Sequence, residues 1–151
     1  MTTEWTRGEF TISTEPSRID LDLVHGFLTD SYWARGIPRE LVERSIEHSL
    51  CFGLYHRDRQ IGFARVITDR ATFGYLGDVF VLEAFRGQGV ARWLMEVVHA
   101  HPELQGFRRW VLLTRDAHAL YREVGYTPLA APERYMEKWT PDVYGNAAGP
   151  E

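Results

Sequence analysis

The feature that most constrains this sequence is an apolar stretch that runs directly into a glycine-rich loop and then into a helical pattern. Residues 75–82 read Y-L-G-D-V-F-V-L, and residues 86–91 read R-G-Q-G-V-A. Such a loop turns sharply because glycine has no Cβ, and the helix after it presents free N–H groups and the positive end of its dipole. The segment predicts a site for a phosphate or pyrophosphate; the alternative is a β–α turn that holds no ligand.

Two common nucleotide-binding motifs do not fit this loop. A P-loop needs Lys and then Ser or Thr after its last glycine, whereas Val90 and Ala91 follow here. A dinucleotide-binding fingerprint needs a third small residue and an acidic residue at the end of the next strand. That strand ends at Leu113 and Thr114. Neither motif is therefore indicated.

The hydrophobic pattern along the chain predicts an α/β domain with a mixed sheet, because hairpins and helical crossovers alternate. Ser17 is the expected N-cap of the first helix. The W-V-L-L run of residues 110–113 is apolar on both faces, which indicates a central strand. Expected strands cover residues 10–13, 50–55, 60–68, 72–82, 109–114 and 135–139 (an edge strand), and expected helices begin near residues 18, 37, 90 and 117.

Two motifs give this chain a family resemblance. R-G-Q-G-V-A matches the R/Q-x-x-G-x-G/A signature of the GNAT N-acetyltransferases, and A-L-Y-R-E-V-G-Y at residues 119–126 resembles their Y-x-x-x-G-F/Y helix. The resemblance implies the acyl-CoA N-acyltransferase fold: a mixed, mostly antiparallel central sheet with splayed central strands, flanked by helices. It also implies an acetyl-CoA-dependent N-acetyltransferase in which an amine attacks the thioester directly.

The resemblance also implies where acetyl-CoA would bind. Backbone amides of the glycine loop would hold its pyrophosphate, and the strand before the loop would lend backbone groups to the pantetheine and thioester. Thr114 stands where family members often carry Asn. The implied cofactor-binding residues are Val79, Phe80, Val81, Arg86, Gly87, Gln88, Gly89, Val90, Ala91, Thr114 and Ala117.

Tyr121 occupies the position of the family's general acid, which protonates the departing thiolate. A thiolate with an aqueous pKa near 8.5 can take a hydrogen bond and a proton from a phenol of pKa about 10 at little cost. Cys51 lies in an apolar run and is expected to pack rather than act as a nucleophile.

Asp78 stands alone in an apolar strand, with Leu76 and Phe80 expected on its face. A carboxylate there is costly unless it is paired or functional. One interpretation is a buried ion pair with Arg65 on the preceding strand. The other is binding of the substrate amine, or general-base catalysis through a water.

Three further side chains are candidates near this chemistry. His118 lies three residues before Tyr121 on the expected helix and can accept a proton from an ammonium substrate. Tyr32 and Trp33 lie between the first two helices, where they either contact the acceptor or pack in the core. Asp116 is expected to cap the helix that carries Tyr121.

Composition restricts the partners. The 151 residues carry a net charge of −4 with no basic run, which argues against nucleic acid. No histidine spacing suits a metal, no apolar stretch suits a membrane, and a single cysteine suits a reducing, cytoplasmic compartment. We expect one domain over residues 1–139 and a loose tail over 140–151, and a homodimer is left open.

These observations favour an enzyme that acetylates a primary amine of a small molecule or amino acid. Two alternatives stay open: a non-catalytic module that binds CoA or acyl-CoA, and an enzyme that modifies protein lysines or N-termini. The general-acid position of Tyr121 favours catalysis, because a pure binder needs no proton donor there.

Overall fold

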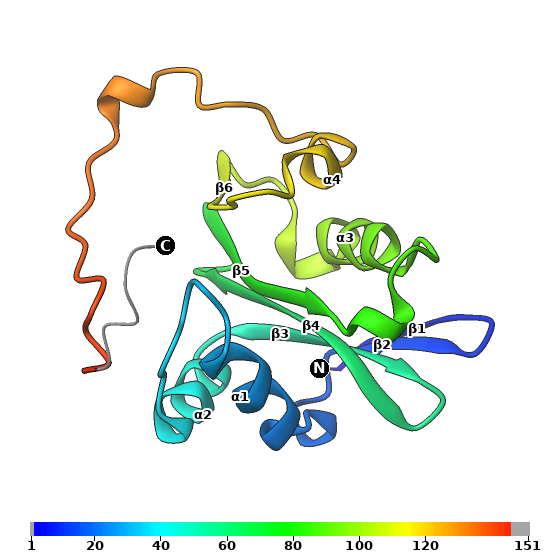
Figure 1. The fold of residues 1–151 in the computed structure, drawn as a ribbon. Helices are drawn as coiled ribbons and strands as arrows, with labels where there is room; N and C mark the ends of the chain where they lie inside the picture. The colour runs from blue at the N-terminus through cyan, green and yellow to red at the C-terminus, as the bar shows by residue number, and fades with distance from the viewer. Residues whose placement is uncertain (1, 146–151) are drawn as a thin grey trace.

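A single six-stranded sheet, with its strands in chain order, organises the protein (Figure 1). The computed structural model describes residues 2–145. Neighbouring strands are antiparallel except β5 and β6, which are parallel, so the sheet is mixed and mostly antiparallel as predicted. The strands are β1 (Glu4–Arg7), β2 (Phe10–Ser13), β3 (Leu50–His56), β4 (Arg59–Thr68), β5 (Phe73–Val81) and β6 (Arg109–Leu112).

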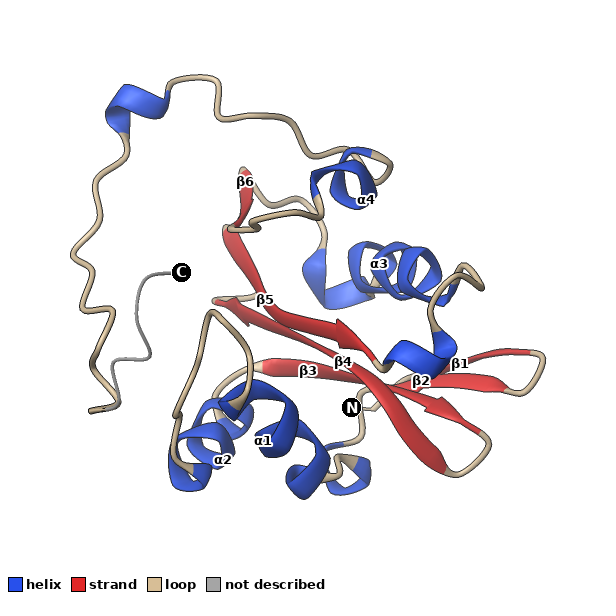
Figure 2. Ribbon diagram, in the orientation of Figure 1, coloured by secondary structure: helices blue, strands red, loops and turns tan. Residues whose placement is uncertain are grey.

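Helices cover both faces of the sheet, which gives three layers (Figure 2). One face carries α1 (Leu21–Thr29) and α2 (Arg39–Glu47), and the other carries α3 (Val90–Ala100) and α4 (His118–Arg122). Within residues 2–145, short 3₁₀ turns lie between these elements at η1 (Pro16–Arg18), η2 (Glu83–Phe85) and η3 (Pro102–Leu104), and a further one, η4 (Pro132–Arg134), follows α4. Within residues 2–145, none of the helices has the length and apolar character needed to cross a membrane.

The two faces bury separate apolar clusters. On the α3 face, Leu76, Leu94 and Met95 are almost completely buried. On the α1–α2 face, Val24 and Phe63 are completely buried, and Phe80 stacks on Phe27 with ring centroids 4.0 Å apart. Side chains alternate between the faces along each strand, and burial of both sets drives the assembly of the layers.

A bulge in β5 interrupts this alternation at Asp78. Phe63 pairs with Phe80, but Arg65 pairs with Gly77, so β5 carries one residue more than β4 between these pairs. Asp78 adopts a φ of 53°, in the left-handed region that Asp tolerates better than most residues. The extra residue sends Leu76 and Phe80 to opposite faces, so the prediction that they share a face is wrong.

The predicted N-cap of the first helix is also wrong. Ser17 lies in η1, and the helix begins four residues later at Leu21. Its cap is Asp20, whose side chain accepts a hydrogen bond from the Leu23 amide at 3.1 Å. Pro16 and the acceptor Glu15 make the tighter turn locally stable, so the apolar pattern starts before the α-helix does.

Three strand predictions need correction. The apolar pattern did not predict β1, because Trp5 is the one apolar residue among its four. In the structure β1 pairs along its full length with β2. The strand at residues 109–114 is shorter and lies at the edge of the sheet, not in its centre. Residues 135–139 form no strand, because no neighbouring strand in the described chain offers them a ladder. Residues 146–151 of the expected tail lie outside the described residues.

Two buried imidazoles predict that stability depends on pH. Burial lowers the pKa of His99 and of His101 below the ordinary value of 6.5. Below about pH 6.5 the unfolded chain therefore binds more protons than the folded chain. The free energy of unfolding has its full value above about pH 6.5 and falls as the pH drops below it. Urea unfolding between pH 8 and pH 5 is the measurement, and a His101→Leu variant should show a flatter dependence. Unfolding free energy that rises on acidification would contradict this.

Candidate active site

The glycine loop has the geometry of an anion cradle. Gly87 and Gly89 adopt φ of 80° and 78°, and Gly89 is the N-cap of α3. The first helical bond of α3 joins the Trp93 amide to the Gly89 carbonyl at 3.1 Å, and within residues 2–145 no side chain caps this end. The amides of Val90 and Ala91 are therefore free for an anion at the positive end of the helix dipole.

The loop is anchored to the strand before it. Arg86 Nε donates a hydrogen bond to the carbonyl of Val81 at 2.9 Å. A Cβ added to Gly87 or Gly89 would meet no atom within 4 Å, so both glycines are required by their positive φ and not by crowding. Gln88 lies between them with an exposed side chain. The surface beside the loop is therefore open to a ligand.

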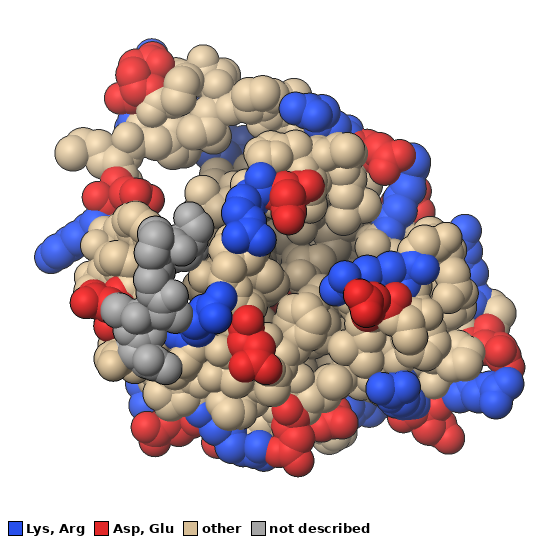
Figure 3. Space-filling view, in the orientation of Figure 1, with Lys and Arg blue, Asp and Glu red and all other residues tan. Residues whose placement is uncertain are grey.

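The second half of β5 is paired on one side only. Parallel pairing with β6 ends at Leu76 and Leu112, whereas β5 continues to Val81 and stays paired with β4. Backbone groups around Val79 to Val81 on the β6 side are therefore free to bond an extended ligand. The side chain of Phe80 is buried, so only its backbone can serve such a ligand. The face of the molecule drawn in Figure 1 is hollowed near its middle, with both acidic and basic side chains around the hollow (Figure 3).

Tyr121 lies on α4, which is held next to the glycine loop. Arg92, in the first turn of α3, bonds Glu123 at 2.8 Å, just after α4 ends. The Tyr121 side chain is 8% exposed, and burial, together with nearby Tyr32, raises the pKa of its hydroxyl to about 12. Among the described residues, His101 Nε2 is the one buried side-chain polar atom that lacks a hydrogen-bond partner. The Tyr121 hydroxyl is therefore not an unpaired polar group inside the core. It keeps its proton at neutral pH and can donate a hydrogen bond to a ligand.

The start of α4 differs from the prediction. Thr114 Oγ1 accepts a hydrogen bond from the Ala117 amide at 3.0 Å, so this hydroxyl orders the turn into α4. Asp116 is exposed and does not cap the helix, which makes the predicted Asp116 cap wrong. Thr114 lies three residues before the amide it bonds, the spacing of a local hydroxyl–backbone turn.

The loop between α1 and α2 closes over this turn. The Tyr32 hydroxyl accepts a hydrogen bond from the Arg115 amide at 3.1 Å, and the Arg115 guanidinium lies 3.9 Å from the centre of the Tyr32 ring. These contacts join residues 83 positions apart in the chain. They bring Tyr32 close enough to Tyr121 to affect its pKa.

A second polar cluster surrounds Asp78 on the α1–α2 face. Arg65 Nε donates to Asp78 Oδ2 at 2.8 Å, and Trp33 Nε1 donates to Asp78 Oδ1 at 2.8 Å. Arg65 also donates to Ser49 Oγ at 3.1 Å. The Arg65 and Asp78 side chains are 17% and 11% exposed, so this is a mostly buried ion pair with both carboxylate oxygens engaged.

The structure therefore gathers most of the candidate side chains on two adjoining clusters. Tyr32 and Tyr121 lie on one, and Trp33 and Asp78 on the other, joined by the adjacency of Tyr32 and Trp33, whose rings are 5.1 Å apart. His118 begins α4 with an exposed side chain. Sequence reasoning missed the roles of Ser49, Arg115 and Glu123, because polar residues in loops and helix ends carry no pattern that reveals their long-range partners.

Comparison with known proteins decides the family. A model of the acetyltransferase (GNAT) domain matches residues 47–128, more than half of the chain. The chain belongs to the GNAT acetyltransferase family. A candidate acetyltransferase of Gibberella zeae is 33% identical over 78% of both chains. The fold, the family and the assignment as an acyltransferase enzyme are thereby confirmed.

Solved structures of GNAT proteins share this fold. A candidate acetyltransferase from Xanthomonas campestris is 51% identical, with a TM-score of 0.88 over 91% of this chain and 97% of its own. A candidate acetyltransferase from Clostridium acetobutylicum, solved with acetyl-CoA, is 12% identical, with a TM-score of 0.62 over 91% of this chain and 96% of its own. At that identity the second likeness concerns the fold alone.

Proposed function

We propose that this GNAT enzyme transfers the acetyl group of acetyl-CoA to a primary amine of a small molecule or amino acid, by direct attack in a ternary complex. The observation that carries the proposal is a set of polar groups that have no partner within residues 2–145: the free amides at the start of α3, the backbone at the half-paired end of β5, and the Tyr121 hydroxyl. Together these groups suit an acyl donor that carries a pyrophosphate, then an extended amide chain and then a thioester.

The donor-binding residues fit acetyl-CoA by their chemistry. The amides of Arg86, Gly87, Gly89, Val90 and Ala91 would hold the pyrophosphate, and the backbone of Val79 to Val81 would bond the pantetheine. The Clostridium relative is solved with acetyl-CoA on the same fold, which supports this choice of donor. Thr114 and Ala117 would contribute by holding the turn into α4 next to the thioester.

The proposed reaction replaces the C–S bond of the thioester by a C–N bond; the amine loses a proton and the departing sulfur gains one. The amine nitrogen bonds to the thioester carbon, and the C–S bond then breaks. A backbone amide near Val79 to Val81 would stabilise the oxyanion, and Tyr121 would donate its proton to the departing thiolate. Raising the Tyr121 pKa from about 10 to about 12 makes full proton transfer less favourable by about 3 kcal/mol, so its hydrogen bond to the developing thiolate matters most.

The acceptor side is proposed to lie where Tyr32, Trp33 and Asp78 meet. The amine must lose a proton, through a water to Asp78 or to His118. Both Asp78 oxygens already accept hydrogen bonds, whereas His118 is exposed at the start of the helix that carries Tyr121. We therefore assign Asp78 mainly to positioning Trp33 and Arg65, and His118 to proton uptake through water.

A covalent acetyl-cysteine route has no support in the geometry. Cys51 is 7% exposed on β3, and burial raises the pKa of its thiol to about 12. It lies in the apolar cluster of the α1–α2 face, so at neutral pH it is a neutral packing group.

Replacing Asp78 by Asn tests the ion pair and the acceptor site together. Loss of the charge leaves the Arg65 guanidinium mostly buried without a counter-ion, and we expect the free energy of unfolding to fall by about 2–4 kcal/mol. The measurement is a denaturant titration together with kcat/KM for the acceptor and the affinity for CoA. If Asp78 positions the acceptor, kcat/KM falls while CoA affinity is kept.

The matched control is Asp22→Asn, which removes one partner of an ion pair with Arg39 whose side chains are 82% and 51% exposed. We expect little change in stability there. An Asp78→Asn protein with wild-type stability and wild-type kinetics would remove Asp78 from both roles.

The acceptor class is tested by thiol release from acetyl-CoA against a panel of amines, amino acids and peptides. We expect turnover with small primary amines or amino acids. Turnover with lysine-containing peptides alone would replace the small-molecule proposal by protein acetylation, and CoA binding without any turnover would favour the non-catalytic module.

A further inference from the structure

Arg115 places a fixed positive charge beside the proposed active site. Its guanidinium carbon lies 3.9 Å from the centre of the Tyr32 ring, well within the roughly 6 Å over which a cation and an aromatic ring attract each other. Its backbone amide donates to the Tyr32 hydroxyl at 3.1 Å. A side chain that is stacked at its tip and anchored at its backbone has few rotamers left, so its charge stays in one place.

The charge of Arg115 is not neutralised inside the protein. Within residues 2–145 its one ion pair is with Asp116, at 4.0 Å, which is too long for a hydrogen bond. The two side chains are 56% and 72% exposed, so water screens most of their attraction. The Arg115 guanidinium is therefore available to an anion that arrives from solvent.

This charge lies where the acceptor must approach. Tyr32, on which Arg115 stacks, is close enough to Tyr121 to contribute to the raised pKa of its hydroxyl. Arg115 itself lies three residues before α4, the helix that carries Tyr121. An acceptor whose amine reaches the thioester beside Tyr121 therefore brings the groups attached to its amine-bearing carbon close to the Arg115 guanidinium.

Trp33 adds a fixed apolar surface to the same place. Its ring lies 5.1 Å from the Tyr32 ring and 6.3 Å from the Phe27 ring, and its indole N–H donates to Asp78 at 2.8 Å. In spite of these contacts, 39% of Trp33 is exposed. An aromatic ring that is held in place and still faces solvent offers apolar contact area to a ligand at little cost in conformational entropy.

We propose that the acceptor is a free amino acid with an apolar side chain, and that Arg115 binds its carboxylate while Trp33 contacts its side chain. A guanidinium can bond both oxygens of a carboxylate at once, a contact that a neutral amide cannot reproduce. A protein N-terminus has a peptide bond in place of this carboxylate, so the same contact selects against protein substrates. The inference rests on the proposed acetyl transfer, because it names the acceptor of that reaction.

Paired substrates test the carboxylate contact. Each pair is an amino acid and its amide: leucine, methionine and phenylalanine with their amides. Thiol release from acetyl-CoA gives kcat/KM for each compound. Acid and amide differ in the basicity of their amines, so the quantity compared is the acid-to-amide ratio of kcat/KM in a variant against that in the wild type, in which this difference cancels. Arg115→Gln should lower the ratio by about tenfold to a hundredfold, chiefly through KM for the acid.

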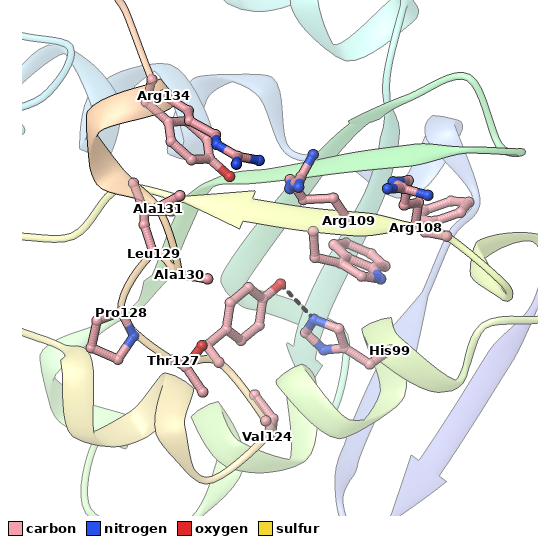
Figure 4. A pocket seen from close by; sticks show the side chains of 15 residues that line it. His99, Arg108, Arg109, Val124, Thr127, Pro128, Leu129, Ala130, Ala131 and Arg134 are labelled. Atoms are coloured by element: carbon pink, nitrogen blue, oxygen red, sulfur yellow. Dashed lines mark hydrogen bonds between the residues drawn. The ribbon is translucent and has the colours of Figure 1, made fainter.

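Arg109→Gln is the matched control. Arg109 is also exposed and forms no ion pair within residues 2–145, but it lines a separate cavity of about 700 Å³ beside β6 (Figure 4). Among the described residues, those that line this cavity do not include Tyr32, Trp33 or Asp78. Arg109→Gln should therefore leave the acid-to-amide ratio unchanged. Arg115→Lys keeps the charge without the planar fork, and its ratio should lie between those of the wild type and Arg115→Gln.

Equal losses for acids and amides in Arg115→Gln would overturn the proposal, because an arginine that only orders the loop affects both alike. So would a wild type that acetylates other primary amines but none of these amino acids. A wild type that acetylates no amine at all would overturn the acetyl transfer itself and this inference with it. Among the acids, the wild type should prefer leucine to glycine by about tenfold or more, and equal kcat/KM values would overturn the contact of the side chain with Trp33.

Discussion

Tyr121→Phe is expected to lower kcat for acetyl transfer roughly 10²–10⁴-fold, with little change in the affinity for CoA. The substitution keeps the aromatic ring, which is 8% exposed and packs at 5.9 Å from the Tyr126 ring, and removes only the hydroxyl. Without it, the thiolate must leave with its full charge in a partly buried site. Steady-state kinetics with a reactive amine, together with calorimetric titration of CoA, separates the two effects.

Tyr126→Phe is the matched control for this loss. Tyr126 is a half-buried tyrosine whose hydroxyl bonds His99 Nε2 at 2.8 Å, so it serves the packing between α3 and the segment after α4. We expect a loss of about 1 kcal/mol in stability and a nearly unchanged kcat. If Tyr121→Phe and Tyr126→Phe have equal kcat values, Tyr121 is not the general acid.

Gly89→Asp is expected to weaken CoA binding by roughly a hundredfold or more. The new carboxylate would stand at the N-cap of α3, where free amides are proposed to receive the pyrophosphate, and two like charges about 4 Å apart repel by several kcal/mol near a protein surface. Asp tolerates the left-handed backbone, and a Cβ at this position meets no atom within 4 Å, so the fold should survive. Calorimetric titration with CoA measures the loss.

Two control variants isolate the charge. Gly89→Asn has the same size and the same backbone tolerance but no charge, and it should retain much more of the affinity than Gly89→Asp. Gly106→Asp adds a carboxylate at a glycine of nearly identical φ, 79°, with equal space around it but away from the start of α3. It should bind CoA normally. Unchanged binding in Gly89→Asp itself would show that the loop is not the pyrophosphate site.

Local features of the candidate site could be predicted from sequence, because they depend on residues close together in the chain. The strand–loop–helix around Gly87 and Gly89 is encoded by glycines that accept positive φ and by apolar spacing before and after them. The short helix carrying Tyr121 was likewise predictable from its spacing and from Gly125 after it. The catalytic role of Tyr121 remains a prediction from the family resemblance.

Contacts across long sequence separations could not be predicted. Trp33 and Asp78 are 45 positions apart, and Tyr32 and Arg115 are 83 apart, yet each pair is within hydrogen-bonding distance. No periodicity connects such residues, because the loop between α1 and α2 is placed by packing of the two helices on the sheet. The pairing of Asp78 with Arg65 was one of two open interpretations, and the bulge that puts Asp78 in its position left no sign in the apolar pattern.

By itself, then, the sequence determined the order of most elements, the position of the glycine loop and the mixed α/β class, since these follow from local backbone preference and from apolar periodicity. Only the tertiary structure decided that β6 lies at an edge and that residues 135–139 form no strand in their own chain. Strand order depends on which backbone edges find a partner, and residues 135–139 have none within the described chain. A strand needs hydrogen bonds to a neighbouring strand, whereas a helix makes its hydrogen bonds within its own segment. The helices were therefore predicted more completely than the sheet.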